Sequence, residues 1–262
     1  MVASVDEGAG LLDFLKSPVA AIQDFYVLAG RAVRNIFRTP HYADDIALQM
    51  DVIGVGSLPI VFLVSFFSGV VITMQMSRAL SQYGATGQVG QIVAITLVRE
   101  LGPVLTAVVV AGRNASGIAS ELGSMTVTEQ IDAMRALGTD PIQKLVTPRM
   151  IATCFMQPML TIIADFVGIF GGFLIARLSL GLSTSQYWTN AYEALKYNDI
   201  VQGLLKPLVF AFVISLVGCF YGLRTSGGTQ GVGRSTTTAV VVSIVWVFMI
   251  TALLTRIFVN LS

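Results

Sequence analysis

Five stretches of this sequence are apolar over lengths that can cross a bilayer, and they constrain the fold more than any other feature. The hydrocarbon core of a membrane is about 30 Å thick, and an α-helix crosses it in about 20 residues. The composition agrees, since 54% of the residues are hydrophobic and only 12% are charged. We therefore predict an all-α integral membrane protein with five transmembrane helices, at residues 52–76, 89–112, 150–176, 203–223 and 239–259.

The basic residues indicate an orientation, because Lys and Arg accumulate on the cytoplasmic side. Most of them precede the first span or lie in the connections after the second and fourth spans: Lys16, Arg31, Arg34, Arg38, Arg113, Arg135, Lys144, Arg149, Arg224 and Arg234. The other side has fewer, namely Arg78, Arg177, Lys196, Arg256 and Lys206, a residue at the boundary of the fourth span. We expect a multi-pass protein with its N-terminus in the cytoplasm and its C-terminus outside.

Residues 1–50 form a separate region ahead of the transmembrane domain at 51–262. Asp6 and Glu7 stand where a signal peptide would be basic, so we expect the first span to act as the insertion signal. Apolar residues then recur at helical spacing from Leu11 to Phe37, with three arginines among them. This pattern predicts an amphipathic helix lying in the cytoplasmic interface. A soluble helix packed on a partner protein is the alternative.

Residues 113–149 are charged and helix-capable, although they lie between two apolar spans. Ser124 or Thr126 can cap a helix, Glu129 can complete a capping box, and Gly138 can end the helix. These signals predict a short helix within residues 120–138. Its apolar side would consist of Val127, Ile131, Met134 and either Leu137 or Ala133. Such a stripe is typical of a helix that docks in a partner's groove, although a re-entrant or interfacial helix has the same pattern.

Three ionisable residues fall inside the spans. Arg99 and Glu100 belong to the second span, with Glu100 about 20 Å along the helix from Arg113, and Asp165 belongs to the third. Buried membrane charges usually face a protein interior or a watery cavity, so they mark candidate functional sites. We interpret them either as a polar spot in a substrate cavity or as an interhelical pair, with Asp165 as a hypothetical partner of Arg99.

Other residues of the spans suggest packing or an apolar cavity. The candidates for a cavity wall are Phe66, Phe67, Val70, Met74 and Met76, which would serve equally in core packing or against lipid. Close helix packing is predicted at the G-x-x-x-G pairs Gly168 and Gly172, and Gly218 and Gly222. No metal site is expected, because Cys154 and Cys219 fall inside spans and His41 is the only histidine.

The segment 228–235, GTQGVGRS, differs from a Walker A motif only in having Arg234 in place of lysine. A phosphate-binding loop follows a buried strand, whereas this segment connects two membrane spans. We interpret it as a glycine-rich turn, in which Ser235, Thr236, Thr237 and Thr238 cap the last helix.

Several separated motifs resemble one protein family. They are RELGP at 99–103, AGR at 111–113, SELGSMTVTEQIDAMRALGTDP at 120–141 and GVGRSTTTAVV at 231–241, within a similarity that covers about residues 50–259. Together they are similar to the MlaE family of ABC transporter permeases.

The resemblance implies a lipid-transporting permease, with phospholipids as the foremost substrate class, in a bacterial inner membrane. It implies a homodimer, a cytoplasmic ABC ATPase subunit that holds ATP and Mg, an MCE-domain lipid-binding protein on the outer face and a small cytoplasmic accessory subunit. This chain would then have no catalytic residue, cofactor or nucleic-acid partner. The residues that would couple it to the ATPase are Glu121, Met125, Glu129, Gln130, Met134 and Gly138.

Two other functions remain open from the residues alone. An ion-coupled secondary carrier would use Glu100 and Asp165 as proton sites, although such carriers usually contain two repeated halves. A non-transporting membrane anchor would need the docking helix but not the buried charges. Co-purification of an ATPase distinguishes the permease from both.

Overall fold

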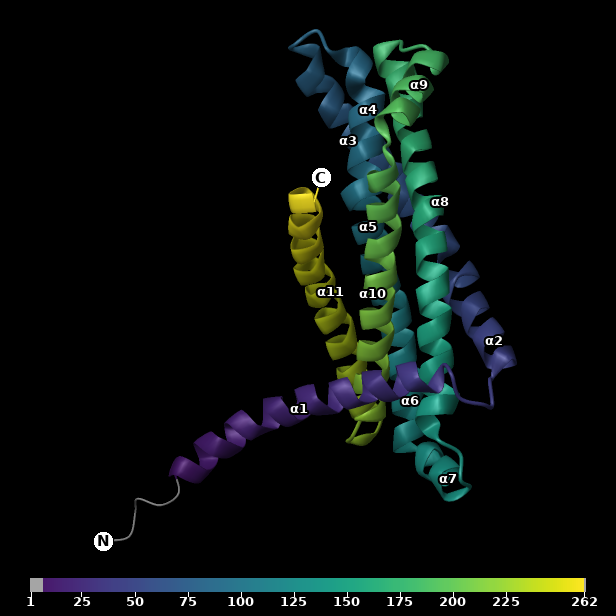
Figure 1. Ribbon diagram of the computed structural model, residues 1–262, viewed down its shortest axis with the longest axis vertical. Coiled ribbons are helices and arrows are strands. Elements are labelled where there is room, and N and C mark those ends of the chain that lie inside the picture. The colour runs from purple at the N-terminus through teal and green to yellow at the C-terminus, as the bar shows by residue number, and fades with distance from the viewer. Residues whose placement is uncertain (1–6, 262) are drawn as a thin grey trace.

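The computed structural model describes the backbone of residues 7–261 and the side chains of residues 19–260, and every regular element in this part is a helix (Figure 1). Five helical segments are long and apolar enough to span a membrane, as predicted. They cover Ala43–Ser81, Thr86–Val127, Ile142–Leu180, Tyr197–Leu223 and Gly228–Asn260. Each segment begins before its predicted apolar run, because the helix extends into the polar residues that precede the run.

Three of these segments contain several elements. The first consists of α2 (Ala43–Ile53), η1 (Val55–Ser57) and α3 (Leu58–Ser81). The second consists of η2 (Thr86–Gln88), α4 (Val89–Thr96), η3 (Leu97–Leu101), α5 (Gly102–Val110), η4 (Ala111–Ala115) and α6 (Ser116–Val127), where η3 and η4 are π-helical turns. The third consists of the π-turn η5 (Ile142–Val146) and α8 (Thr147–Leu180). The fourth is α10 (Tyr197–Leu223), and the fifth is α11 (Gly228–Leu261).

Shorter helices mark the two ends of the bundle. Helices α1 (Glu7–Asn35) and α7 (Gln130–Ala136) lie at one end, whereas α9 (Thr184–Ala194) and the α3–α4 connection lie at the other (Figure 1). We call these the α7 end and the α9 end. At the α9 end, the Ser183 hydroxyl caps α9 and the buried Tyr187 hydroxyl donates to the Ile169 carbonyl. Burial raises the pKa of the Tyr187 phenol, which keeps this donor protonated.

Helix α1 runs across the α7 end of the bundle, roughly perpendicular to the long helices (Figure 1). Its buried residues Leu28 and Ala32 join the hydrophobic core at that end. Two ion pairs fasten it there, from Asp24 to Arg224 at 3.0 Å and from Arg31 to Asp140 at 3.3 Å. Several of its large apolar side chains stay exposed: Val19, Ile22, Tyr26 and Val33. Its described part therefore packs one apolar face on the chain's own bundle and leaves other apolar side chains exposed. Its position in the cytoplasmic interface stays a prediction.

Helix α8 is the centre of the bundle, because α2, α3, α5 and α10 all pack against it. Glycine permits the closest approach: a Cβ atom on Gly69 of α3 would overlap the carbonyl oxygen of Gly168 in α8. At Gly172 a Cβ atom would lie 2.6 Å from the Thr73 hydroxyl. On α10, a Cβ at Gly218 would lie 3.2 Å from the Ala115 backbone, and one at Gly222 would lie 2.8 Å from the Leu122 Cβ.

The predicted glycine-rich turn before the last span is wrong. Helix α11 begins at Gly228, so the GTQGVGRS segment is helical and the turn falls at residues 224–227. The threonine hydroxyls donate to carbonyls one turn earlier, from Thr236 to Val232 at 2.7 Å for example, and cap no helix start. The sequence concealed this because glycine, serine and threonine favour turns locally, whereas packing of α11 on α6 and α10 selects the helix.

Candidate functional site

The second span is irregular where its charges lie. The π-turn η3 contains Arg99 and Glu100, and Pro103 follows at the start of α5. Proline has no N–H, so the Arg99 carbonyl loses the partner that an α-helix would give it. The Lys206 ammonium on α10 replaces that partner by donating to the Arg99 carbonyl at 2.8 Å. A charged side chain of α10 thus replaces a backbone hydrogen bond that is missing in the second span.

Lys206 also holds a carboxylate. Its Nζ lies 2.7 Å from Glu100 Oε1, and the lysine side chain has no exposed surface. The Thr255 hydroxyl of α11 lies 3.0 Å from the Lys206 Nζ and 3.1 Å from both Glu100 oxygens. Three spans therefore meet at one polar cluster, Glu100–Lys206–Thr255, and each charge in it has an opposite charge or a hydroxyl beside it.

Arg99 forms a separate ion pair with Asp199 at the start of α10. Asp199 also accepts a hydrogen bond from the Lys196 backbone N–H at 2.9 Å, so its carboxylate caps α10 as well. The hypothetical pair between Arg99 and Asp165 is therefore wrong. Asp165 lies against Gly102, where any Cβ atom would overlap its Oδ1, and this oxygen has no hydrogen-bond partner among the described residues.

Lys206, Asp199 and Thr255 were not predicted as partners of these charges. Lys206 was expected at the outer boundary of the fourth span, whereas α10 begins at Tyr197 and Lys206 lies nine residues inside it. The second and fourth spans run in the same direction, but a count from their starts does not pair the two residues, because Glu100 lies fourteen residues after Thr86 and Lys206 nine residues after Tyr197.

At the α7 end, the chain turns sharply between α6 and α7. Glu129 has a left-handed backbone conformation, with φ of 60°. The predicted capping box is wrong, because α6 continues to Val127 and the Thr126 hydroxyl donates back to Leu122 at 2.8 Å. Helix α7 begins only at Gln130, so it is shorter than predicted. It ends beside Gly138, whose φ of 81° suits glycine.

The apolar stripe of this segment is divided between the inside and the outside. Ile131 is buried, and Met125 and Met134 pack against the core at the α7 end. Leu137 is 83% exposed, and Glu129 and Gln130 are exposed too. Met125 and Met134 therefore contact their own bundle, and their role in coupling the chain to an ATPase stays a prediction. The exposed surface of the turn is formed by Glu129, Gln130 and Leu137.

Glu121 has a structural partner. Its Oε1 lies 2.6 Å from Nη2 of Arg149, whose side chain is only 4% exposed. A buried guanidinium needs a counter-charge, and Glu121 supplies it from α6 to the start of α8.

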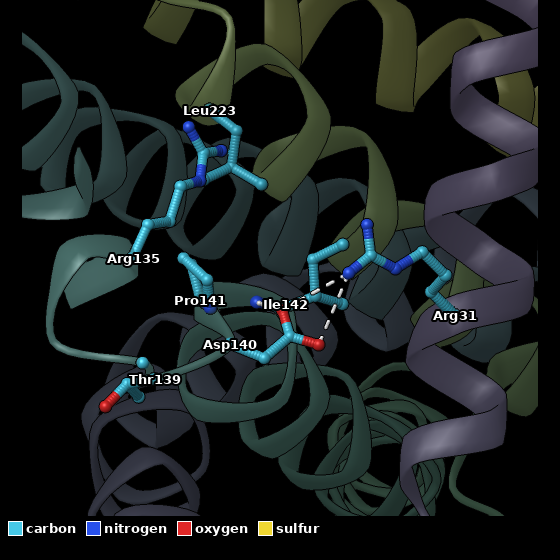
Figure 2. Close-up of a pocket in the computed structure, with 8 residues that line it drawn as sticks. Arg31, Arg135, Thr139, Asp140, Pro141, Ile142 and Leu223 are labelled. Atoms are coloured by element: carbon cyan, nitrogen blue, oxygen red, sulfur yellow. Dashed lines mark hydrogen bonds and ion pairs between the residues drawn. The ribbon is translucent and has the colours of Figure 1, made fainter.

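An open pocket of about 450 Å³ lies between α1, the end of α10 and the segment that follows α7. Figure 2 shows Arg31 reaching from α1 towards Asp140, with Arg135 across the pocket beside Leu223. Ile142 contributes to its apolar floor, and Gly138 also lines it. The pocket lies between α1 and the end of the segment that was predicted to dock a partner.

The candidate cavity residues of the first span lie on different sides of α3. Phe67 and Met74 are exposed, whereas Phe66, Val70 and Met76 are partly buried. Phe67 contributes to a shallow, mainly apolar groove of about 330 Å³ that includes Leu101 and Leu105 of the second span. The structure does not bring all five residues to one cavity. Among the described residues, no group of His, Cys, Asp and Glu has the arrangement of a metal site.

The fold and the buried charge cluster define a five-span α-helical integral membrane protein. Its sequence matches the Permease MlaE family over residues 46–257. It is 40% identical to a probable ABC transporter permease protein of Rickettsia prowazekii, over 87% of this chain and 88% of the relative. A probable ABC transporter permease protein of Synechocystis is 43% identical, over 86% of this chain and 85% of the relative.

A plant relative shows the breadth of the similarity. The chloroplastic protein trigalactosyldiacylglycerol 1 of Arabidopsis thaliana is 40% identical, over 85% of this chain and 64% of the relative. The chain belongs to the MlaE permease family.

Proposed function

We propose that this protein is the membrane subunit of an ABC transporter that moves lipids, most of all phospholipids, between the inner membrane and an MCE-domain carrier. A separate ATPase subunit would bind ATP and Mg and drive the transport. The protein would act as a homodimer, with a small accessory subunit in the cytoplasm. Family membership and the name of the plant relative support the lipid substrate.

One structural observation carries the proposal. The second span continues as α6 beyond its apolar part, turns at Glu129 and places α7 at the end of the bundle (Figure 1). This turn is fixed to the bundle by Ile131 and Met134, and it exposes Glu129, Gln130 and Leu137. A partner that pushed on this surface would move α6 and the second span together, because the helix joins them.

The contacts of the charged residues in the spans favour a role in packing or in a polar cavity wall over the role of proton sites in an ion-coupled carrier. Glu100 is already paired with Lys206 and Thr255, so its proton exchange would have to break both contacts. Asp165 has no such partner among the described residues, but it belongs to a different helix and lies against Gly102. The two carboxylates share no hydrogen-bond partner among the described residues.

The test is co-purification of an ATPase with the tagged full-length chain, comparing wild type with Leu137→Glu. Leu137 is 83% exposed, so a new charge there should release the ATPase without changing the melting temperature of the chain. The matched control is Tyr83→Glu, because Tyr83 is equally exposed at the α9 end. It should leave ATPase binding unchanged.

Lipid transfer is then measured between vesicles and the purified MCE-domain partner, with and without ATP. ATP-dependent transfer that Leu137→Glu abolishes would support the proposal. Stoichiometric assembly without lipid transfer would instead favour a membrane anchor, and ATP-independent transfer driven by a proton gradient would favour the carrier.

A further inference from the structure

A second polar pocket lies between α2 and the η4–α6 part of the second span. Its volume is about 200 Å³, and its polar side chains are Gln49, Arg113, Asn114 and Glu121. None of the buried charges near η3 belongs to it. The proposed coupling surface around Leu137 does not form it either, so its polar groups need an explanation of their own.

Arg113 and Asn114 both have unused hydrogen-bond donors. Among the described residues, no carboxylate pairs with the Arg113 guanidinium. Gly56 leaves space for that group, because a Cβ atom there would lie 2.8 Å from Nη1 and 2.9 Å from Cζ. Asn114 is 95% buried, since its relative exposure is 5%, and its Nδ2 has no acceptor within the described part of the chain. A buried amide donor is normally paired, so an acceptor is expected here.

We infer that this pocket binds the phosphodiester headgroup of a membrane phospholipid, with Arg113 and Asn114 donating to the phosphate oxygens. A guanidinium fork and an amide N–H match the oxygens of a phosphate in charge and in geometry. The inference deepens the proposed function, and it rests on that function in taking the bound lipid to be one that the permease moves. Headgroup binding itself can be measured without transport.

The surroundings favour a lipid over free phosphate. An exposed apolar row lies beside the pocket, formed by Leu48 (60% exposed) and Val52 (50%) of α2 and by Val55 (56%) of η1. These residues recur one helical turn apart, and Val52 also lines the pocket. Acyl chains that follow this row would leave the headgroup at Arg113. Free phosphate would gain nothing from it.

Glu121 adds a preference among headgroups. It lies two turns after Arg113 on the same face of the helix, about 12 Å along the axis. Gly117 lies between them, and no atom occupies the space within 4 Å of its Cβ position. The Glu121 carboxylate uses Oε1 for Arg149, yet a carboxylate can accept further donors. A headgroup with an amine, such as phosphoethanolamine, therefore fits better than one that is only anionic.

The experiment is photocrosslinking in cells that are grown on radioactive phosphate. A benzoylphenylalanine replaces Val52 in the full-length chain, and the radioactive phospholipid attached to the purified chain is counted. Phe62, which is 51% exposed on α3 and does not line the pocket, receives the same probe as the background position. Arg113→Gln removes the charge, and Gly56→Ala displaces the guanidinium without changing any charge. Arg234→Gln is the matched control, because Arg234 is exposed and lies outside the pocket.

We expect both pocket variants to lower the adduct at Val52 by about tenfold, the equivalent of one charge-assisted hydrogen bond. The adduct at Phe62 should not change, and Arg234→Gln should have no effect at either position. An undiminished adduct at Val52 in both variants would overturn the inference. So would complete competition by inorganic phosphate in isolated membranes, which would assign the pocket to the free anion.

ATPase co-purification of the same variants separates this inference from the proposed function. If the ATPase is retained while the adduct falls, both stand. If Arg113→Gln releases the ATPase and leaves the adduct at Val52 unchanged, the pocket docks protein and the headgroup site is refuted. If wild type binds no ATPase but shows the Arg113-dependent adduct, the proposed function fails alone. Gel filtration of each variant checks that it remains folded.

Discussion

Lys206 Nζ lies 2.7 Å from Glu100 Oε1, although the two residues are 106 positions apart in the chain and the lysine side chain has no exposed surface. The same ammonium completes the hydrogen bonding of the Arg99 carbonyl, which Pro103 deprives of its helical partner. The Lys206 side chain therefore neutralises the Glu100 carboxylate and also donates the hydrogen bond that the Arg99 carbonyl lacks.

Lys206→Met should lower the free energy of unfolding by about 3 kcal/mol, because it leaves the Glu100 carboxylate and the Arg99 carbonyl without their donor. Thermal denaturation of the purified chain in detergent measures this loss. The double variant with Glu100→Gln should recover part of it, since glutamine carries no charge to neutralise. A double variant that is less stable than Lys206→Met alone would contradict the pairing.

Arg99 should couple energetically to Asp199 and not to Asp165. In a double-mutant cycle of Arg99→Gln and Asp199→Asn, we expect a coupling energy of about 1 kcal/mol, because the first variant already removes the ion pair. The cycle of Arg99→Gln and Asp165→Asn should be additive. Equal coupling in the two cycles, measured by the same denaturation assay, would show that the arginine alternates between the carboxylates.

Gly69→Ala should destabilise the protein by about 2 kcal/mol, because the new methyl group would overlap the Gly168 carbonyl and push α3 away from α8. The matched control is Gly112→Ala, also within a span, where no atom lies within 4 Å of the new Cβ. Alanine is the better helix former, so this control should be neutral or slightly stabilising. Melting temperatures in detergent decide the outcome, and two equal values would rule out the close approach.

Glu129→Gly should stabilise the fold by about 1 kcal/mol, because glycine adopts the left-handed conformation at the α6–α7 turn without the penalty of a Cβ atom. Glu129→Ala keeps the Cβ atom and should bring no such gain. The pair of variants also separates backbone from charge in ATPase binding, since both remove the carboxylate. If alanine stabilises the protein as much as glycine does, the turn has no such strain.

The sequence was sufficient for the general architecture. Five apolar runs of membrane length predicted the spans, because a bilayer imposes a minimum length and an apolar surface on any helix that crosses it. The motifs in the second span and after it, RELGP and SELGSMTVTEQ among them, identified the family that the comparison then showed. The prediction of the spans depends on hydrophobicity and the family assignment on residue identity, and neither property changes with the structural context of a residue.

Local signals misled where packing competes with them. Thr126 and Glu129 have the residue types and spacing of a capping box, yet α6 continues past Thr126 and Glu129 becomes the turn itself. Residues 228–235 look like a loop, yet they form the start of α11 because α6 and α10 lie beside it. Cap and turn preferences are worth about 1 kcal/mol, which the packing of a long helix exceeds.

The partners of the buried charges were decided by the tertiary structure alone. The sequence predicted that Arg99, Glu100 and Asp165 each require a counter-charge or a hydrogen-bond partner inside the bilayer, because an isolated charge is costly there. Which residue supplies it depends on the depth and rotation of neighbouring helices, and those follow from glycine contacts such as Gly69 against Gly168. The chain therefore determined by itself that it spans a membrane five times, whereas only the packed bundle determined that Lys206 meets Glu100 and that Asp199 meets Arg99.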